Sequence, residues 1–318
     1  MRTPVDLAVR VGSVELPNPV MTASGTAGHA DELAAYFDLS ELGAVVVKSL
    51  SAEPWAGNAA PRVHETDGGM LNSVGLQNPG AEAWLAEELP ELLATRARIV
   101  ASIWGFTVEA YEKVAATLAD APPQVVAVEV NLSCPNVESR RDMFAHSAAA
   151  TADAMAATAT CNRPRWAKLS PNVTDLTEIA GAALGAGAEA LTLINTVMGM
   201  AIDPESGEPR LGAGGGGLSG PAIKPLALAR CHEVVRAVSI PVLGSGGIMN
   251  GRDALEFIAV GATAVQVGTA SFIRPRAAAQ VVEEMARLLA ERGIRRIEAW
   301  RGCLEPAASP APAAGRRA

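Results

Sequence analysis

The sequence has little that would let it cross a membrane, form disulfides or hold a metal cluster. Its four cysteines are widely separated, at positions 134, 161, 231 and 303, and none is in a Cys-x-x-Cys pair. Neither a structural zinc site nor a self-contained iron–sulfur cluster is therefore expected. The amino-terminal stretch lacks the apolar segment of a signal peptide, and no apolar run reaches the roughly 20 residues that span a bilayer. These absences predict a cytoplasmic protein with free thiols.

The chain also lacks the positive charge that nucleic-acid binding requires. Its net charge is −8 and its pI is about 5.2, so it has no excess of cations to neutralise phosphates. Hydrophobic residues make up 49% of the sequence and charged residues 19%, which is typical of a globular protein. A chain of 318 residues is long enough for one large α/β barrel.

Eight short apolar segments alternate with helical patterns along the chain. The expected strands are residues 19–24, 44–49, 99–103, 125–132, 166–170, 190–195, 241–244 and 263–268. The expected helices are residues 30–39, 81–93, 108–118, 148–157, 177–184, 223–238, 251–260 and 276–292. Strict alternation predicts a parallel sheet, and eight units predict a closed (β/α)8 TIM barrel, with an open doubly wound sheet as the alternative. We expect an N-terminal hairpin at 6–16, a single domain over 1–304, and a disordered Pro/Ala-rich tail over 305–318.

Long loops are expected after strands two, four and six. The first covers residues 50–79, and the third covers 196–220 and contains four consecutive glycines. Loops of this length are usually functional or disordered. A mobile lid over a reaction site is the favoured interpretation, and a disordered surface insertion is the alternative.

Side chains that follow the strands should meet at one mouth of a barrel. This set is Ser24, Lys48, Ser102, Asn131 with Cys134, Lys168, Asn195 with Thr196, Gly246–Gly247, and Gly268–Thr269. Two lysines at equivalent positions favour an anionic ligand. The glycine turns after strands seven and eight favour a phosphate, because bare backbone N–H groups can approach its oxygens.

Cys134 is the candidate for proton transfer. It follows a buried strand on a polar turn, and Pro135 keeps it out of helical structure. An ordinary cysteine pKa of about 8.5 is close enough to neutrality for a base. Cys161 and Cys231 fall on helical segments and are interpreted as buried hydrophobic residues. His146 lies in the following loop, where a solvated role is expected.

Several motifs together resemble dihydroorotate dehydrogenase, over about residues 5 to 290. They are VKS (47–49), LNSVGLQNPG (71–80), NLSCPNV (131–137), KLSPNV (168–173), INT (194–196), LSGPAIKP (218–225), GSGGI (244–248) and VGTA (267–270). Cysteine at 134 is similar to the class 1 enzymes. The stretch INTVMGM (194–200) is most similar to the catalytic subunit of the NAD-linked type, also called type 1B.

The resemblance implies an FMN-dependent oxidation of dihydroorotate to orotate in pyrimidine (UMP) biosynthesis. In this reading Cys134 removes the C5 proton while a hydride passes from C6 to flavin N5. The implied flavin contacts are Ser24, Lys48, Ser49, Ser102, Asn131, Lys168, Ile194, Gly220, Gly246, Gly247, Gly268 and Thr269. The implied substrate contacts are Lys48, Asn72, Ser73, Val74, Gly75, Leu76, Asn131, Asn195 and Thr196.

Two departures from the family pattern stand out. Ser102 occupies a position where the family usually has asparagine, which puts flavin affinity or tuning in question. Residues 138–144 replace a segment that is usually glycine-rich, which puts loop dynamics and substrate choice in question. The resemblance also implies a homodimer. It further implies a partner subunit with FAD and a 2Fe–2S cluster that passes electrons to NAD, giving a heterotetramer.

Four alternatives stay open at this point. The chain could be a stand-alone enzyme that uses fumarate or a quinone, or a reductase of dihydropyrimidines. It could instead be a flavin-free phosphate-binding barrel, or a barrel kept as a binding or assembly subunit. Reduction of fumarate, turnover of uracil or thymine, and the colour of bound flavin distinguish among them.

Overall fold

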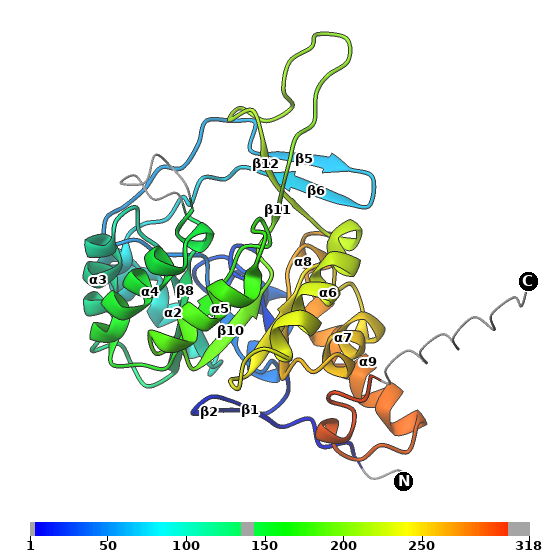
Figure 1. Cartoon of the computed structure of the whole chain (residues 1–318). Helices are drawn as coiled ribbons and strands as arrows, with labels where there is room; N and C mark the ends of the chain where they lie inside the picture. The colour runs from blue at the N-terminus through cyan, green and yellow to red at the C-terminus, as the bar shows by residue number, and fades with distance from the viewer. Residues whose placement is uncertain (1–3, 135–142, 305–318) are drawn as a thin grey trace, which may run out of the picture.

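The structure is a computed structural model that describes residues 4–134 and 143–304 (Figure 1). The expected tail at 305–318 lies outside the described residues, as do Pro135 and most of the 138–144 segment.

Eight parallel strands form the barrel. They are β3 (Val20–Thr22), β4 (Val45–Val46), β7 (Ile99–Ile103), β8 (Val125–Asn131), β9 (Arg165–Lys168), β10 (Ala190–Leu193), β13 (Val242–Ser245) and β14 (Ala264–Val267). Their order in the sheet is β3-β14-β13-β10-β9-β8-β7-β4. A parallel bridge between Met21 and Ala44 joins the two end strands, and Gly43 N donates to Val20 O at 2.8 Å. The predicted (β/α)8 barrel is confirmed.

Helices surround the barrel, as Figure 1 shows. They are α1 (Ala81–Ala83), α2 (Leu89–Ala94), α3 (Val108–Thr117), α4 (Ala148–Ala157), α5 (Leu176–Gly185), α6 (Lys224–Val235), α7 (Gly251–Ala259), α8 (Ala270–Ile273) and α9 (Ala277–Glu291). Side-chain caps fix the residue at which several helices begin. Asp175 accepts from two backbone N–H groups of α5, and Asn250 does the same for α7. Along the two described stretches, no helix combines the length and apolar character needed to cross a membrane.

The expected helix at 30–39 is wrong. This segment forms two 3-10 turns instead, Glu32–Ala35 and Leu39–Glu41. The Glu32 carboxylate accepts from the backbone of His29 and Ala30, and the Asp38 carboxylate accepts from Ser40 N. Such local bonds compete with a continuous helix. The N-terminal hairpin is confirmed as β1 (Val9–Val11) paired with β2 (Val14–Leu16).

The two long loops after strands two and six contain regular strands, which differs from the alternative of a disordered surface insertion. They form a four-stranded antiparallel sheet of β5 (Val63–Thr66), β6 (Gly69–Asn72), β11 (Val197–Gly199) and β12 (Gly216–Ser219). We call this the lid sheet, and Figure 1 shows it beyond one end of the barrel. A Cβ on Gly217 would lie 2.0 Å from Thr196 Oγ1, and one on Gly216 would lie 2.4 Å from Asn72 O. Two of the four glycines therefore allow close strand packing.

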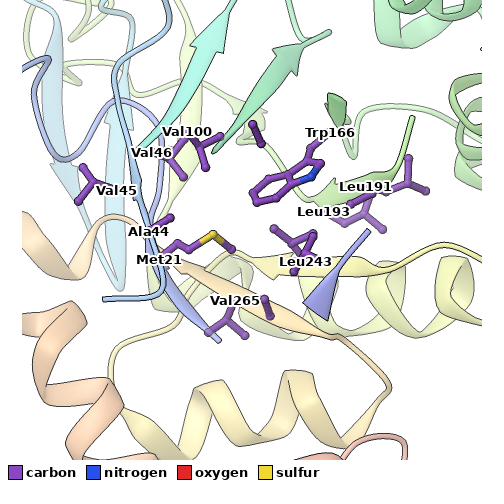
Figure 2. Close-up of a cluster of buried hydrophobic side chains, with 14 of the residues drawn as sticks. Met21, Ala44, Val45, Val46, Val100, Trp166, Leu191, Leu193, Leu243 and Val265 are labelled. Atoms are coloured by element: carbon purple, nitrogen blue, oxygen red, sulfur yellow. The ribbon is translucent and has the colours of Figure 1, made fainter. Parts of the chain in front are cut away.

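Large apolar side chains fill much of the barrel interior. Figure 2 shows Met21, Val46, Val100, Trp166 and Leu243 within one buried cluster, and all five are nearly inaccessible to solvent. Bulky residues in such layers make the barrel a packed core and not a pore. The space for a ligand is therefore restricted to the mouth.

Candidate active site

A cavity of about 390 Å³ lies at the carboxyl ends of the barrel strands, between the mouth and the lid sheet. This volume is within the usual range for small-molecule sites. Of the residues expected to contact a cofactor, those lining the cavity are Ser24, Lys48, Ser49, Asn131, Lys168, Ile194, Gly220, Gly246, Gly247, Gly268 and Thr269. Of the expected substrate contacts, the further lining residues are Asn72, Ser73, Val74, Gly75, Leu76, Asn195 and Thr196. The structure thus brings together segments that are widely separated in sequence.

The charge of the cavity wall is positive. Lys48 and Lys168 line the cavity, and no Asp or Glu is among the described lining residues. Burial lowers the pKa of Lys48 from its ordinary value, and the nearby Cys134 opposes this shift. Burial also lowers the pKa of Lys168, and the charge of Glu129 opposes it. Two ammonium groups with no carboxylate on the wall suit a ligand with negative charge.

Amides and hydroxyls form a hydrogen-bonded wall beside the lysines. Asn195 Nδ2 donates to Asn131 Oδ1 at 3.2 Å, and Asn131 Nδ2 donates to Ser49 Oγ at 3.3 Å. Ser49 Oγ also lies 3.1 Å from Ser24 Oγ and 2.9 Å from Ser102 Oγ. Ser102 is fully buried behind Ser49 and does not line the cavity. Any influence of Ser102 on a ligand would pass through Ser49.

The turns after β13 and β14 present backbone to the cavity. Gly246 and Gly247 have positive φ, at 123° and 75°. A Cβ on Gly247 would lie 2.6 Å from Lys224 Cβ, and one on Gly246 would lie 2.9 Å from Ala227 Cβ. Only glycine satisfies both the conformation and the packing there. With Gly268 and Thr269 on the next turn, this edge fits the phosphate end of a cofactor.

The lid sheet supplies the opposite wall. Asn72 at the end of β6 donates to Gly217 O at 3.3 Å, which joins the two loops. Asn58 Nδ2 donates to Ser73 Oγ at 2.8 Å and fixes that hydroxyl. Sequence reasoning missed Asn58 and also Asn172, which donates to Thr196 O at 3.1 Å. Asn172 belongs to the quoted KLSPNV motif, which already pointed to the correct loop.

Cys134 lies beside the cavity and not on its wall. Its side chain is fully buried, and its thiol contacts Asn131 O at 3.4 Å. Burial raises the Cys134 pKa to about 12, although a hydrogen bond from Tyr111 and the charge of Lys48 oppose the rise. The expectation of a displayed thiol with a near-neutral pKa is therefore wrong for this conformation. Cys161 and Cys231 are buried as predicted, and His146 is exposed as predicted.

A buried polar group beneath the cavity also escaped sequence reasoning. Glu129 on β8 accepts at Oε2 from Thr192 Oγ1 at 2.9 Å and from Gln266 Nε2 at 2.5 Å. Gln266 Oε1 in turn accepts from Lys168 Nζ at 2.8 Å. From the sequence, residues 125–132 are predicted only as a short apolar strand. The glutamate within it, two residues before Asn131 and so on the same strand face, was the available signal.

Comparison with known proteins decides the family. The family model for dihydroorotate dehydrogenase matches residues 6–289. The chain belongs to the dihydroorotate dehydrogenase family.

Three relatives of this family carry the name dihydroorotate dehydrogenase B (NAD(+)), catalytic subunit. The protein of Trichlorobacter lovleyi is 51% identical over 300 residues, covering 94% of this chain and 98% of the relative. That of Pelobacter propionicus is 49% identical over 304 residues, covering 94% of this chain and 99% of the relative. That of Geobacter sulfurreducens is 48% identical over 301 residues, covering 94% and 98%. The predicted resemblance is thus confirmed, and the family implies a flavin cofactor.

Proposed function

We propose that this chain is the catalytic subunit of an NAD-linked dihydroorotate dehydrogenase, which oxidises dihydroorotate to orotate in pyrimidine biosynthesis. The observation that carries the proposal is a doubly cationic cavity at the mouth of a barrel of this family, lined by amides and by two glycine turns. A stand-alone fumarate-using enzyme, a dihydropyrimidine reductase and an assembly subunit are the weaker alternatives, because none matches the names of the relatives.

FMN is the proposed cofactor. Its phosphate would bind the turns at Gly246–Gly247 and Gly268–Thr269, where backbone forms the cavity edge. Its ring would lie near Lys168, which is held by Gln266. When bound, the flavin accepts the hydride that the substrate loses. The protein positions the ring and excludes water from it.

The substrate would occupy the space between the barrel mouth and the lid sheet. Lys48 would bind its carboxylate, because an ammonium and a carboxylate form a charge-assisted hydrogen bond. Asn72, Asn131 and Asn195 would bind the imide edge, which both donates and accepts hydrogen bonds. In this arrangement Lys48 would bind the substrate and Lys168 would bind the cofactor.

Cys134 is the proposed base for the C5 proton. In the described conformation its thiol bonds to Asn131 O and is protonated at neutral pH, since its pKa is about 12. The thiol must therefore turn toward the cavity, nearer to Lys48, and release its own proton to water before the thiolate can accept the C5 proton. The positive charge of Lys48 would then favour the thiolate.

Electrons would leave through a second polypeptide. In the 4–134 and 143–304 stretches, no group of three His, Cys, Asp or Glu side chains could hold a metal ion. The relatives' name, catalytic subunit, agrees with a separate partner. We propose that the partner carries FAD and a 2Fe–2S cluster, and that two copies of this chain and two of the partner form a heterotetramer around a homodimer.

The decisive test is an anaerobic stopped-flow mix of the purified chain with dihydroorotate, followed through flavin absorbance. We expect rapid bleaching by dihydroorotate and none by dihydrouracil or dihydrothymine. Bound flavin that stays yellow would refute the substrate, and a colourless protein that takes up no FMN would refute the cofactor. Cys134→Ala should keep FMN and lose most of the bleaching rate.

A further inference from the structure

A polar layer crosses the barrel interior directly beneath the cavity. Glu129 on β8 and Gln266 on β14 are hydrogen-bonded at 2.5 Å. In the closed ring of strands, three strands separate β8 from β14 in either direction. Their side chains can meet only through the centre of the barrel. Both residues are fully buried. Glu129 lies two positions before Asn131 at the end of β8, and Gln266 lies two positions before Gly268, which directly follows β14. Asn131 and Gly268 both line the cavity, so the two buried side chains lie directly below its wall.

The Gln266 amide links a buried carboxylate to a buried ammonium. Its Nε2 donates to Glu129 Oε2 and its Oε1 accepts from Lys168 Nζ at 2.8 Å. An amide that faces an acceptor at one end and a cation at the other has only one favourable orientation. The Lys168 ammonium is thereby held at the cavity wall by a side chain from the opposite part of the barrel.

The other charged groups near this layer are few. Burial lowers the pKa of Lys168, and Glu129 is the charge that raises it. Lys48 lines the same cavity from the β4 side, and the group whose charge acts on it is Cys134. Thr192 from β10 donates to Glu129 and carries no charge. Glu129 is thus the acidic group that faces Lys168 among the described residues.

A purely structural role would not explain this layer. A buried carboxylate is costly, and well-packed apolar residues in its place are often neutral or stabilising. Glu129 Oε1 has no hydrogen-bond partner within the described part of the chain, which adds to that cost. A buried charge in the centre of the barrel, linked through Gln266 to the lysine of the cavity wall, indicates a requirement of the site above it.

We propose that Glu129 and Gln266 are positioning residues that keep the Lys168 ammonium charged and directed into the cavity. The inference rests on the proposed function in that Lys168 would contact the flavin. Neither Glu129 nor Gln266 would touch cofactor or substrate.

The chain offers a direct measurement of the Lys168 charge because it contains only four lysines, at 48, 113, 168 and 224. The full-length chain as purified is labelled with 13C at lysine Cε, and the four NMR signals are titrated from pH 6 to 12. The Lys168 signal is assigned by its loss in Lys168→Met. The variants are Glu129→Gln, which removes the charge, and Gln266→Met, which removes the bridge at similar volume. Glu129→Asp restores the charge.

We expect Glu129→Gln to raise the acid dissociation constant of Lys168 about tenfold or more, because an opposite charge is lost at a buried site. Gln266→Met should raise this dissociation constant less than Glu129→Gln does. In Glu129→Asp the dissociation constant of Lys168 should stay within about threefold of its value in the unmodified chain. Thr22→Val is the matched control, since the Thr22 hydroxyl is equally buried but bonds to Val46. It should leave the Lys168 titration unchanged.

A second measurement separates this inference from the proposed function. The rate of flavin bleaching by dihydroorotate is measured against pH, and in Glu129→Gln it should fall at a lower pH than in the unmodified chain, by the shift seen in the Lys168 titration. If dihydroorotate bleaches the flavin but the Lys168 titration is identical in all variants, the inference is refuted and the function stands. If the titration shifts as expected but dihydroorotate never bleaches the flavin, the function fails and the positioning role stands. If Glu129→Gln does not fold, Gln266→Met alone decides, and an unchanged titration refutes the inference.

Discussion

The buried position of Cys134 predicts that its thiol reacts very slowly with alkylating agents. With a pKa of about 12, only about one thiol in ten thousand is ionised at pH 8. An ordinary cysteine with a pKa near 8.5 is about one quarter ionised at that pH. The ratio of these fractions predicts alkylation about two-thousandfold slower than at an exposed cysteine. Any need for the chain to open around the buried thiol slows it further.

The protein contains its own reference for this measurement. Cys303 is exposed, and Cys231 is buried with a pKa also raised to about 12. The chain is treated with iodoacetamide at pH 8, quenched at intervals, and the modified peptides are quantified by mass spectrometry. The Cys134 rate should also rise about tenfold per pH unit between pH 8 and 10. Modification of Cys134 within tenfold of Cys303 at pH 8 would refute the reasoning.

Four further substitutions test separate parts of the structure. Lys48→Met should weaken orotate binding about tenfold to a hundredfold in fluorescence titrations, because a charge-assisted contact is lost; unchanged binding would contradict its carboxylate role. Gly217→Ala should raise the KM for dihydroorotate with little loss of bound flavin, since the new Cβ would clash with Thr196 in the lid sheet. Trp166→Ala should lower the free energy of unfolding in urea by about 3–5 kcal/mol, because Trp166 is fully buried in the barrel core. Gly181→Ala should raise the free energy of unfolding by about 0.5–1 kcal/mol, because alanine favours a helix over glycine. The added methyl meets no atom within 4 Å on the exposed face of α5.

The barrel could be predicted from the sequence because each of its units carries a strong local signal. Val, Ile and Ala runs mark the strands, and α4 has the predicted bounds Ala148–Ala157. The site followed from the same rule, since residues after the strands of a parallel barrel share one mouth. Lys48, Asn131, Lys168 and Asn195 therefore appeared on the cavity wall together.

The lid sheet could not be predicted because its pairing joins loops far apart in the chain. β6 pairs with β12 through Gly217 and Asn72, which are 145 residues apart. Neither strand has a hydrophobic alternation that would reveal it, and glycine has low strand propensity. The prediction of a helix at 30–39 was wrong because side chains such as Asp38 accept hydrogen bonds from nearby backbone N–H groups.

Glu129 shows that the environment of a lysine at the barrel mouth depends on the buried residues beneath it as well as on the strand that carries it. Lys48 follows a short strand and is influenced by Cys134, whereas Lys168 ends a strand that packs beside β8 and is influenced by Glu129. Two lysines that look equivalent in sequence therefore differ in their counter-charge. Lys48 faces a group that is neutral until a proton is removed from it, while Lys168 is held by an amide bonded to a carboxylate. A lysine with a fixed counter-charge suits a cofactor that stays bound through every cycle. A lysine beside an ionisable thiol suits a substrate that must give up a proton and leave.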